Sequence, residues 1–144
     1  EGTFQELPGR SACVGCPAGQ FASGSGATAC VSCDAGFFQL FGGSTHCEQC
    51  SNGTFAASAG LAECTACEAG KHGRAPGETR RDCVSCDAGF FQSQAGASAC
   101  EACPGGSISD GPGRSTCTAC PAGEFVGASA ATARGMISYD SAKN

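Results

Sequence analysis

The chain has little of what builds an ordinary apolar core. Its 144 residues include no tryptophan, one methionine and one tyrosine, and leucine, isoleucine and valine are sparse. The hydrophobic share of 41% is raised by alanine and by the cysteines themselves. Because so little apolar surface can be buried, we expect covalent cross-links to replace a hydrophobic core.

Positive charge is also scarce. Eight Lys and Arg residues stand against 13 Asp and Glu, which gives a net charge of −5. Apart from the pair Arg80-Arg81, no basic cluster occurs, so binding to nucleic acid or to an anionic membrane surface is not expected. No apolar run approaches the ~20 residues of a membrane span, and the first residues do not form a signal sequence. We therefore expect any targeting or anchoring segment to lie outside this chain.

Catalytic constellations are missing as well. The two histidines, His46 and His72, lie in different parts of the repeat described below, and no Ser/His/Asp or Cys/His arrangement is apparent. No dense acidic loop of the kind that binds calcium occurs either. The sequence thus predicts a protein that is not an enzyme and needs no cofactor.

Cysteine and glycine are abundant instead. The 14 cysteines form seven C-x2-C pairs whose first members are 17 residues apart, except for one step of 19. Such regular self-similarity indicates a tandem array of small repeats. The pairs are Cys13/Cys16, Cys30/Cys33, Cys47/Cys50, Cys64/Cys67, Cys83/Cys86, Cys100/Cys103 and Cys117/Cys120.

Other positions follow the same period. The third residue after each pair is always glycine, here called the turn glycine (Gly19, Gly36, Gly53, Gly70, Gly89, Gly106, Gly123). A second glycine, the loop glycine, stands four residues before most of the following pairs (Gly26, Gly43, Gly60, Gly96, Gly113). Between them lies an aromatic slot, in which His72 and Ile108 replace phenylalanine (Phe4, Phe21, Phe38, Phe55, His72, Phe91, Ile108, Phe125).

These positions predict short hairpins. Glycine suits a bend with positive φ or a close approach of two backbones. Pro17, Pro104 and Pro121, with Asp34 and Asp87 at the equivalent place, favour a turn directly after the cysteine. Stretches such as "GFFQ" leave room for two or three residues of strand, and no segment has a helical period. We expect the aromatic residue to cover the neighbouring disulfide.

Cysteines at this spacing can either bind zinc or form disulfides. The spacing is close to that of four-cysteine zinc sites. However, 14 thiolates do not divide into groups of four, and the repetition is unbroken. We therefore favour disulfides, no metal, and an oxidising extracellular location.

The loop lengths favour one disulfide pattern. A bond within a C-x2-C pair would close a small strained ring, whereas a bond from one pair to the next closes a loop of about 15 residues, worth up to about 3 kcal/mol. The alternative is a ladder between alternate repeats. The favoured bonds are Cys16–Cys30, Cys33–Cys47, Cys50–Cys64, Cys67–Cys83, Cys86–Cys100 and Cys103–Cys117.

This pattern leaves the first and last cysteines without partners. Residues 1–13 read as the second half of a repeat, 14–120 as the tandem repeats, and 121–144 as an open last repeat with a cysteine-free tail. Either the chain is a window on a longer array, or Cys120 of one copy bonds Cys13 of the next. The tail stretch "MISY" is β-prone and suggests a strand of a further domain or one added to a neighbouring subunit.

The unit C-[PDE]-A-G-x-F-x4-G-x3-C-x2-C resembles the ephrin-receptor-like cysteine-rich repeat, which is similar to loops of EGF and tumour-necrosis-factor-receptor modules. The resemblance covers residues 2–125. It implies a small disulfide-rich repeat array, an elongated rod of ~17-residue units with short β-hairpins and little or no helix. Such repeats occur in receptor ectodomains and in surface proteins of protists and algae, including the flagellar hairs called mastigonemes.

Two function classes follow. The first is a structural subunit or segment of an extracellular filament or surface coat, mastigoneme-like and glycosylated, whose partners are copies of itself or further repeats head-to-tail. The sequon at Asn52 is a candidate for N-glycosylation. The second is a ligand-binding or adhesion ectodomain of a cell-surface receptor. We favour the first, because the variable positions carry small polar residues and no aromatic or arginine hot spot is evident.

Overall fold

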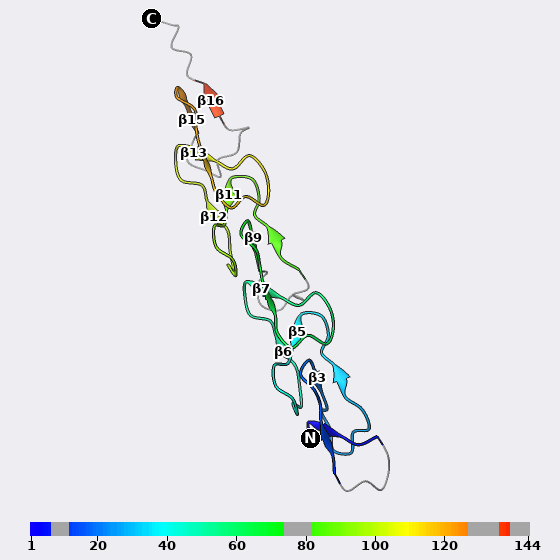
Figure 1. The fold of residues 1–144 in the computed structure, drawn as a ribbon. Helices are drawn as coiled ribbons and strands as arrows, with labels where there is room; N and C mark the ends of the chain where they lie inside the picture. The colour runs from blue at the N-terminus through cyan, green and yellow to red at the C-terminus, as the bar shows by residue number, and fades with distance from the viewer. Residues whose placement is uncertain (7–11, 74–81, 127–135, 139–144) are drawn as a thin grey trace, which may run out of the picture. The chain divides into compact units, whose positions relative to one another are not determined.

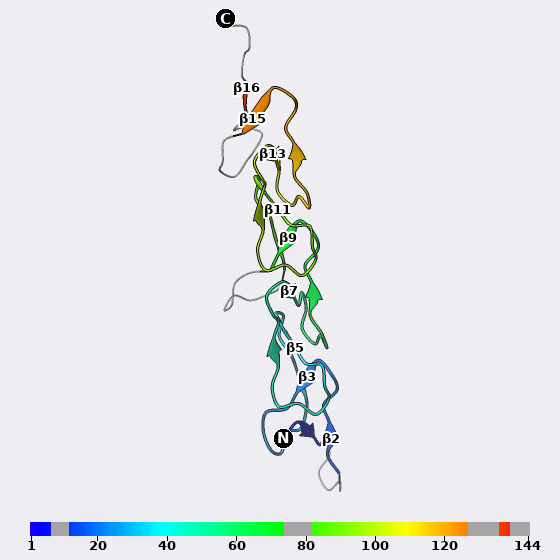
Figure 2. The same cartoon turned by 90° about the vertical axis from the view of Figure 1, so that its left-hand side faces the viewer.

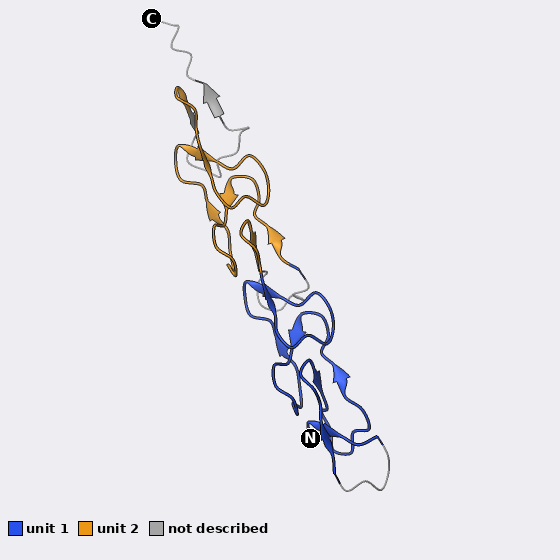
Figure 3. Ribbon diagram, viewed as in Figure 1, with its two compact units in different colours: residues 1–66, 75–82 blue, residues 67–74, 83–144 orange. Residues whose placement is uncertain are grey.

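The structure is a computed structural model that describes residues 1–6, 12–73, 82–126 and 136–138. The chain divides into two compact units (Figure 3). Unit 1 comprises Glu1–Ala66 with Ala75–Asp82, and unit 2 comprises Cys67–Arg74 with Cys83–Asn144. Within each unit the hairpins follow one another in chain order (Figure 1 and Figure 2).

Throughout the described ranges the secondary structure consists of short strands, with no helix. Each odd-numbered strand pairs with the even-numbered strand that follows it, in an antiparallel two-stranded sheet. The predicted fold class, a small disulfide-rich array of short β-hairpins, is confirmed. The strands are β1 (Thr3–Phe4), β2 (Val14–Gly15), β3 (Gln20–Phe21), β4 (Val31–Ser32), β5 (Phe37–Phe38), β6 (Glu48–Gln49), β7 (Thr54–Phe55), β8 (Thr65–Ala66), β9 (Lys71–His72), β10 (Val84–Ser85), β11 (Phe90–Phe91), β12 (Glu101–Ala102), β13 (Ser107–Ile108), β14 (Thr118–Ala119), β15 (Glu124–Val126) and β16 (Met136–Ser138).

A tight turn starts each hairpin. In the first complete repeat the N–H of Gln20 donates to the carbonyl of Pro17 at 3.1 Å, and Gly19 between them has a φ of 80°. A positive φ at the third residue is typical of a type II turn and strongly favours glycine. The N–H of Cys33 then donates to the carbonyl of Gly19 at 2.9 Å and extends the ladder between β3 and β4. The predicted turn after the cysteine is confirmed.

Consecutive loops bind each other through the backbone. The N–H of Gly19 donates to the carbonyl of Gln39 at 2.7 Å, and that of Ala22 to Ser44 at 3.0 Å. In the opposite direction the N–H of Gly43 donates to the carbonyl of Cys16 at 2.8 Å. Unit 2 repeats this pattern with Gly70 to Gln92, Gly73 to Ala97 and Gly96 to Cys67, at 2.7, 3.0 and 2.7 Å. Backbone N–H and C=O groups that face inward thus find their hydrogen-bond partners in the neighbouring loop.

Loops two repeats apart meet at pairs of glycines. A β-carbon added to Gly19 would overlap the carbonyl oxygen of Gly60 and lie 2.7 Å from its carbon. The same contact joins Gly70 to Gly113 and Gly2 to Gly43. The turn glycine therefore serves two purposes at once, since it supplies a positive φ and lets another backbone approach closely.

The core is thin and consists largely of sulfur. The second cysteine of each pair is buried from Cys16 to Cys86, with exposed fractions of 0 to 2%. Ala22 and Ala56 are the other small residues buried within the hairpins. This arrangement agrees with the shortage of large apolar residues, because the disulfides fill the space that aliphatic side chains fill elsewhere.

The tail differs from expectation. The strand β16 pairs with β15 inside the chain, and the register Glu124↔Ser138 matches Lys71↔Ser85 in the longer repeat. Met136 therefore stands at the register position of Cys83, 16 residues after Cys120. The expectation that the tail drops the repeat and serves a further domain or a neighbour is wrong for these strands. The usual spacing would place the closing residue of this repeat near Arg134. The repeat is two residues longer, so that spacing misses Met136. Arg80-Arg81 lies outside the described residues.

We predict that Gly19→Ala lowers the free energy of unfolding by at least about 2 kcal/mol, because a positive φ costs an L-residue roughly 1–2 kcal/mol and the β-carbon would also strike Gly60. Calorimetric unfolding with the disulfides intact measures the loss. In the matched control, Gly24→Ala, the β-carbon meets nothing within 4 Å, so stability stays within about 0.5 kcal/mol. Gly19→Asn separates the two causes, since asparagine tolerates positive φ. Wild-type stability of Gly19→Asn would refute the close contact.

Candidate functional site

The histidines and acidic residues form no metal-binding group in the described ranges. No group of three or more His, Cys, Asp and Glu residues in these ranges is placed to hold a metal ion. His46 is exposed, and its Nδ1 lies 3.2 Å from Oγ1 of Thr45. His72 is half-buried in β9, and its Nδ1 lies 3.4 Å from the carbonyl oxygen of Gly73. No helix of the described part is long and apolar enough to cross a membrane.

Six disulfides are the chemically defining feature. Each one joins the second cysteine of a pair to the first cysteine of the next, with Cα atoms 5.7 or 5.8 Å apart. This is the pairing that loop length favours, and it leaves only Cys13 and Cys120 unpaired, so the ladder between alternate repeats does not form. The bonds are Cys16–Cys30, Cys33–Cys47, Cys50–Cys64, Cys67–Cys83, Cys86–Cys100 and Cys103–Cys117.

Two cysteines remain as free thiols. Cys13 is exposed, and Cys120 is half-buried. Twelve of the fourteen sulfurs are thus consumed by disulfides and cannot serve as zinc thiolates. Cys120 lacks a closing cysteine because methionine occupies position 136.

The aromatic slot lies at the second residue of each hairpin's first strand. The phenylalanines whose side chains are described, with His72, are half-buried, and Ile108 is buried with 9% of its surface exposed. The residues with described side chains are Phe4, Phe21, Phe38, Phe55, His72, Phe91 and Ile108. The side chain of Phe125 lies outside the described part.

Asn52, the glycosylation candidate, is exposed in the turn between Cys50 and β7. The N–H of Thr54 closes this turn by donating to the carbonyl of Ser51 at 3.1 Å. The hydroxyl of Thr54, which completes the sequon, donates to the same carbonyl at 2.9 Å.

A glutamine after the aromatic slot braces two of the loops from inside. The side-chain nitrogen of Gln39 donates to the carbonyl of His46 at 2.8 Å, and its oxygen accepts from the N–H of Phe41 at 3.2 Å. Gln92 makes the same two bonds, to Ala99 and Gln94, at 2.8 and 3.0 Å. Sequence reasoning missed this role, although the glutamine is visible in "GFFQ".

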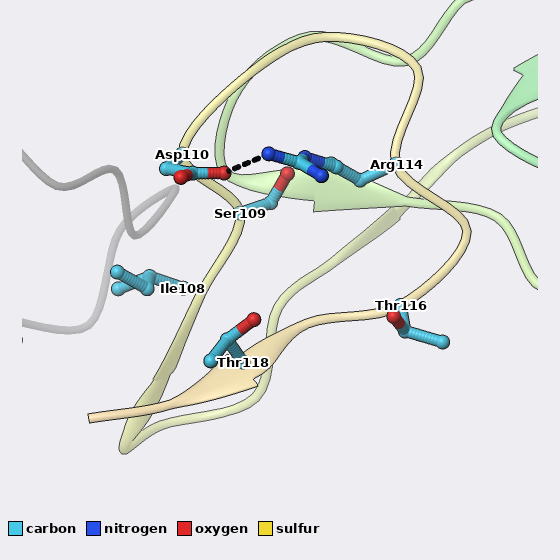
Figure 4. A pocket seen from close by; sticks show the side chains of 6 residues that line it. All are labelled: Ile108, Ser109, Asp110, Arg114, Thr116 and Thr118. Atoms are coloured by element: carbon cyan, nitrogen blue, oxygen red, sulfur yellow. Dashed lines mark hydrogen bonds and ion pairs between the residues drawn. The ribbon is translucent and has the colours of Figure 1, made fainter. Parts of the chain in front are cut away.

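Serine stands at this position in the loop closed by Cys103–Cys117, where a hollow lies beside it. Its volume is about 100 Å³, and it is lined by Ile108, Ser109, Asp110, Arg114, Thr116 and Thr118 (Figure 4). The hydroxyl of Ser109 donates to the carbonyl of Gly111 at 3.1 Å. Arg114 pairs with Asp110 at 2.8 Å, with both side chains more than half exposed. Such an exposed pair contributes little stability.

The surface exposes more large apolar side chains than the sequence suggests. Leu40 and Phe41 are 50% and 71% exposed at the tip of the loop closed by Cys33–Cys47. Val14 and Val31 are exposed on β2 and β4. Phe41 is thus an exposed aromatic residue in a chain for which no aromatic hot spot was expected.

Together, the hairpins and their disulfides define a cysteine-rich repeat protein of the receptor-ectodomain type. A family described as "Tyrosine-protein kinase ephrin type A/B receptor-like" matches residues 19–60 and 73–115, which is more than half of the chain. The chain therefore belongs to the ephrin-receptor-like repeat family. A search of the curated proteins found no match.

We predict that Cys13 and Cys120 are the two cysteines that iodoacetamide alkylates in the folded, monomeric protein. Proteolysis without reduction, followed by mass spectrometry, identifies the cross-linked peptides. The expected set includes Cys16–Cys30 and Cys86–Cys100, because each disulfide closes one hairpin loop. Peptides that link alternate repeats, such as one joining Cys16 to Cys50, would contradict the structure.

We predict that Ser109→Gln stabilises the loop by about 1 kcal/mol, since glutamine there can reach the carbonyl of Thr116 and the N–H of Gly111 as Gln92 reaches Ala99 and Gln94. The reciprocal change, Gln92→Ser, should cost a similar amount. Thermal unfolding of both variants measures the effect. A Ser109→Gln variant less stable than the wild type would contradict the bracing role of the glutamine.

Proposed function

We propose that the chain is a non-catalytic, structural segment of an extracellular filament or surface coat, built from disulfide-stapled spacers. One observation carries the proposal. Cysteines and backbone groups form the turns, the disulfides and the loop-to-loop contacts. The side chains at the variable positions are therefore not needed for these contacts. Spacing and toughness are the properties that such a segment supplies.

The redox chemistry supports a location outside the cell. Six disulfides in a chain of this size persist in oxidising surroundings and are rare in the cytosol. The family to which the chain belongs is described as receptor-like, which favours an extracellular or cell-surface protein. The exposed Asn52 is proposed to carry an N-linked glycan. A mastigoneme-like filament is the finer form of this proposal.

The partners proposed for this segment are further repeats or other copies of the chain, in head-to-tail order. The exposed Cys13 and the half-buried Cys120 are the two thiols able to join them covalently. Two thiols yield a disulfide by losing two electrons and two protons to an oxidant such as glutathione disulfide or oxygen.

A second function, a ligand-binding or adhesion ectodomain, is favoured by one observation. The Leu40–Phe41 tip presents an aromatic and an aliphatic side chain side by side in sequence, both at least half exposed. Exposed aromatic residues are common anchors of protein interfaces.

We predict that antibodies raised against the chain label filaments or a continuous coat on the native cell surface at a regular spacing, as seen by immunogold electron microscopy. Discrete particles that bind a protein ligand saturably would overturn the structural proposal. In that case, Leu40→Ser with Phe41→Ser abolishes binding if the tip is the anchor. Val31→Ser, also an exposed residue of unit 1, is the matched control and leaves binding unchanged.

A further inference from the structure

Two loops hold a side-chain carboxamide between the same two backbone groups. The amide nitrogen of Gln39 donates to the carbonyl of His46, seven residues on, and its amide oxygen accepts from the N–H of Phe41, two residues on. Gln92 bonds the carbonyl and the N–H at the same two offsets, at 2.8 and 3.0 Å. Both glutamines are buried, with 4% and 6% of their surface exposed. The loop backbone therefore supplies a carboxamide with one acceptor and one donor.

The loop closed by Cys103–Cys117 has the same two backbone groups without the carboxamide. Ser109 stands at the position of the glutamine, and its hydroxyl donates to the carbonyl of Gly111 at 3.1 Å. The groups at the matching offsets are the carbonyl of Thr116 and the N–H of Gly111. Neither makes a hydrogen bond within the part of the chain that the structure describes. Both are therefore available to a ligand that can accept one bond and donate the other.

Space for such a ligand lies beside Ser109. Ser109 and Thr118 lie on one side of the hollow, and Arg114 and Thr116 lie on the other (Figure 4). The volume of about 100 Å³ equals that of about three water molecules at roughly 30 Å³ each, which is roughly the room that acetamide needs. Alanine also stands at the glutamine position in other loops, as at Ala22. A short residue alone thus does not define the site, and the hollow is the second requirement.

The lining favours a neutral polar group. Arg114 is paired with Asp110 at 2.8 Å, so the positive charge in the lining is already balanced. Hydroxyls of Ser109, Thr116 and Thr118 supply further polar atoms. A carboxylate would meet Asp110 as well as Arg114, and it has no proton to donate to a backbone carbonyl. A primary carboxamide both accepts and donates, as the two glutamines do.

We propose that the hollow beside Ser109 binds a primary carboxamide, the group that Gln92 supplies to its own loop. The oxygen of the ligand accepts from the N–H of Gly111, and its nitrogen donates to the carbonyl of Thr116. Glutamine side chains of a partner polypeptide and small free amides both carry this group. The site lies within a single loop of unit 2 and does not depend on the proposed structural role.

The test is a titration of the oxidised chain with acetamide, followed through its backbone amide NMR signals. We expect saturable shifts at Gly111 and at Cys117, whose N–H belongs to the same peptide group as the carbonyl of Thr116. Ser109→Gln should weaken binding at least about tenfold, because its own amide occupies both partners. In the opposite direction, Gln92→Ser empties the equivalent space and should add a second set of saturable shifts, at Gln94.

Two controls separate an amide site from general stickiness. Acetate is close to acetamide in size but lacks the N–H donor, so it should bind at least about tenfold more weakly. Ser115→Gln is the same substitution at an exposed serine of the same loop, outside the lining of the hollow, and should bind acetamide like the parent. Intact mass with six disulfides verifies the folding of each variant.

The tripeptide glycyl-glutaminyl-glycine distinguishes the two sources of the amide. Its binding supports a site for a polypeptide side chain, and binding of acetamide alone supports a site for small free amides. The proposal is overturned if acetamide gives no saturable shift, if acetate binds as tightly, or if Ser109→Gln leaves binding unchanged. Should Ser109→Gln fail to form its six disulfides, Gln92→Ser decides, since the absence of a second set of shifts would also overturn the proposal.

Discussion

The contact between backbones at the turn glycines is the interaction on which the rest of the structure depends. A hairpin with two-residue strands has too few hydrogen bonds to be stable alone. In this chain hairpins gain bonds from the next loop, at Gly19 to Gln39 and at Gly43 to Cys16, and the turns at Gly2, Gly19 and Gly70 are covered by a loop two repeats on. A β-carbon at Gly2, Gly19 or Gly70 would collide with the loop that covers it, so these turns require glycine.

The disulfides and the glycine contacts contribute to the stability of the fold in different ways. The disulfides reduce the entropy of the unfolded chain, by up to about 3 kcal/mol for each loop in the chain-entropy model. They do not position one loop on the next. The backbone contacts do so, and because they involve no particular side chain, the variable positions are free to carry polar residues, glycans or an exposed tip such as Leu40–Phe41. An extracellular spacer needs this combination.

Most of the fold could be predicted from the sequence, because the features that fix it recur every 17 residues. The hairpins, the turns at Gly19 and its equivalents, and the six cysteine pairings all follow from that period. Non-periodic features could not be predicted. The pairing of Met136–Ser138 with β15 depends on an unusual spacing, and the hollow beside Ser109 is lined by residues of a single repeat. The contact of Gly19 with Gly60 spans two repeats, so only the three-dimensional arrangement reveals it.

The central claim is that the N–H groups of turn glycines such as Gly19 are hydrogen-bonded to backbone carbonyls of the following loop. Amide hydrogen exchange measured by NMR on the oxidised protein tests it most directly. The account predicts slow exchange at Gly19, Gly36, Gly70 and Gly89, whose N–H groups donate to the next loop, and fast exchange at the exposed Gly24 and Gly105. Equally fast exchange at both sets of glycines would contradict it.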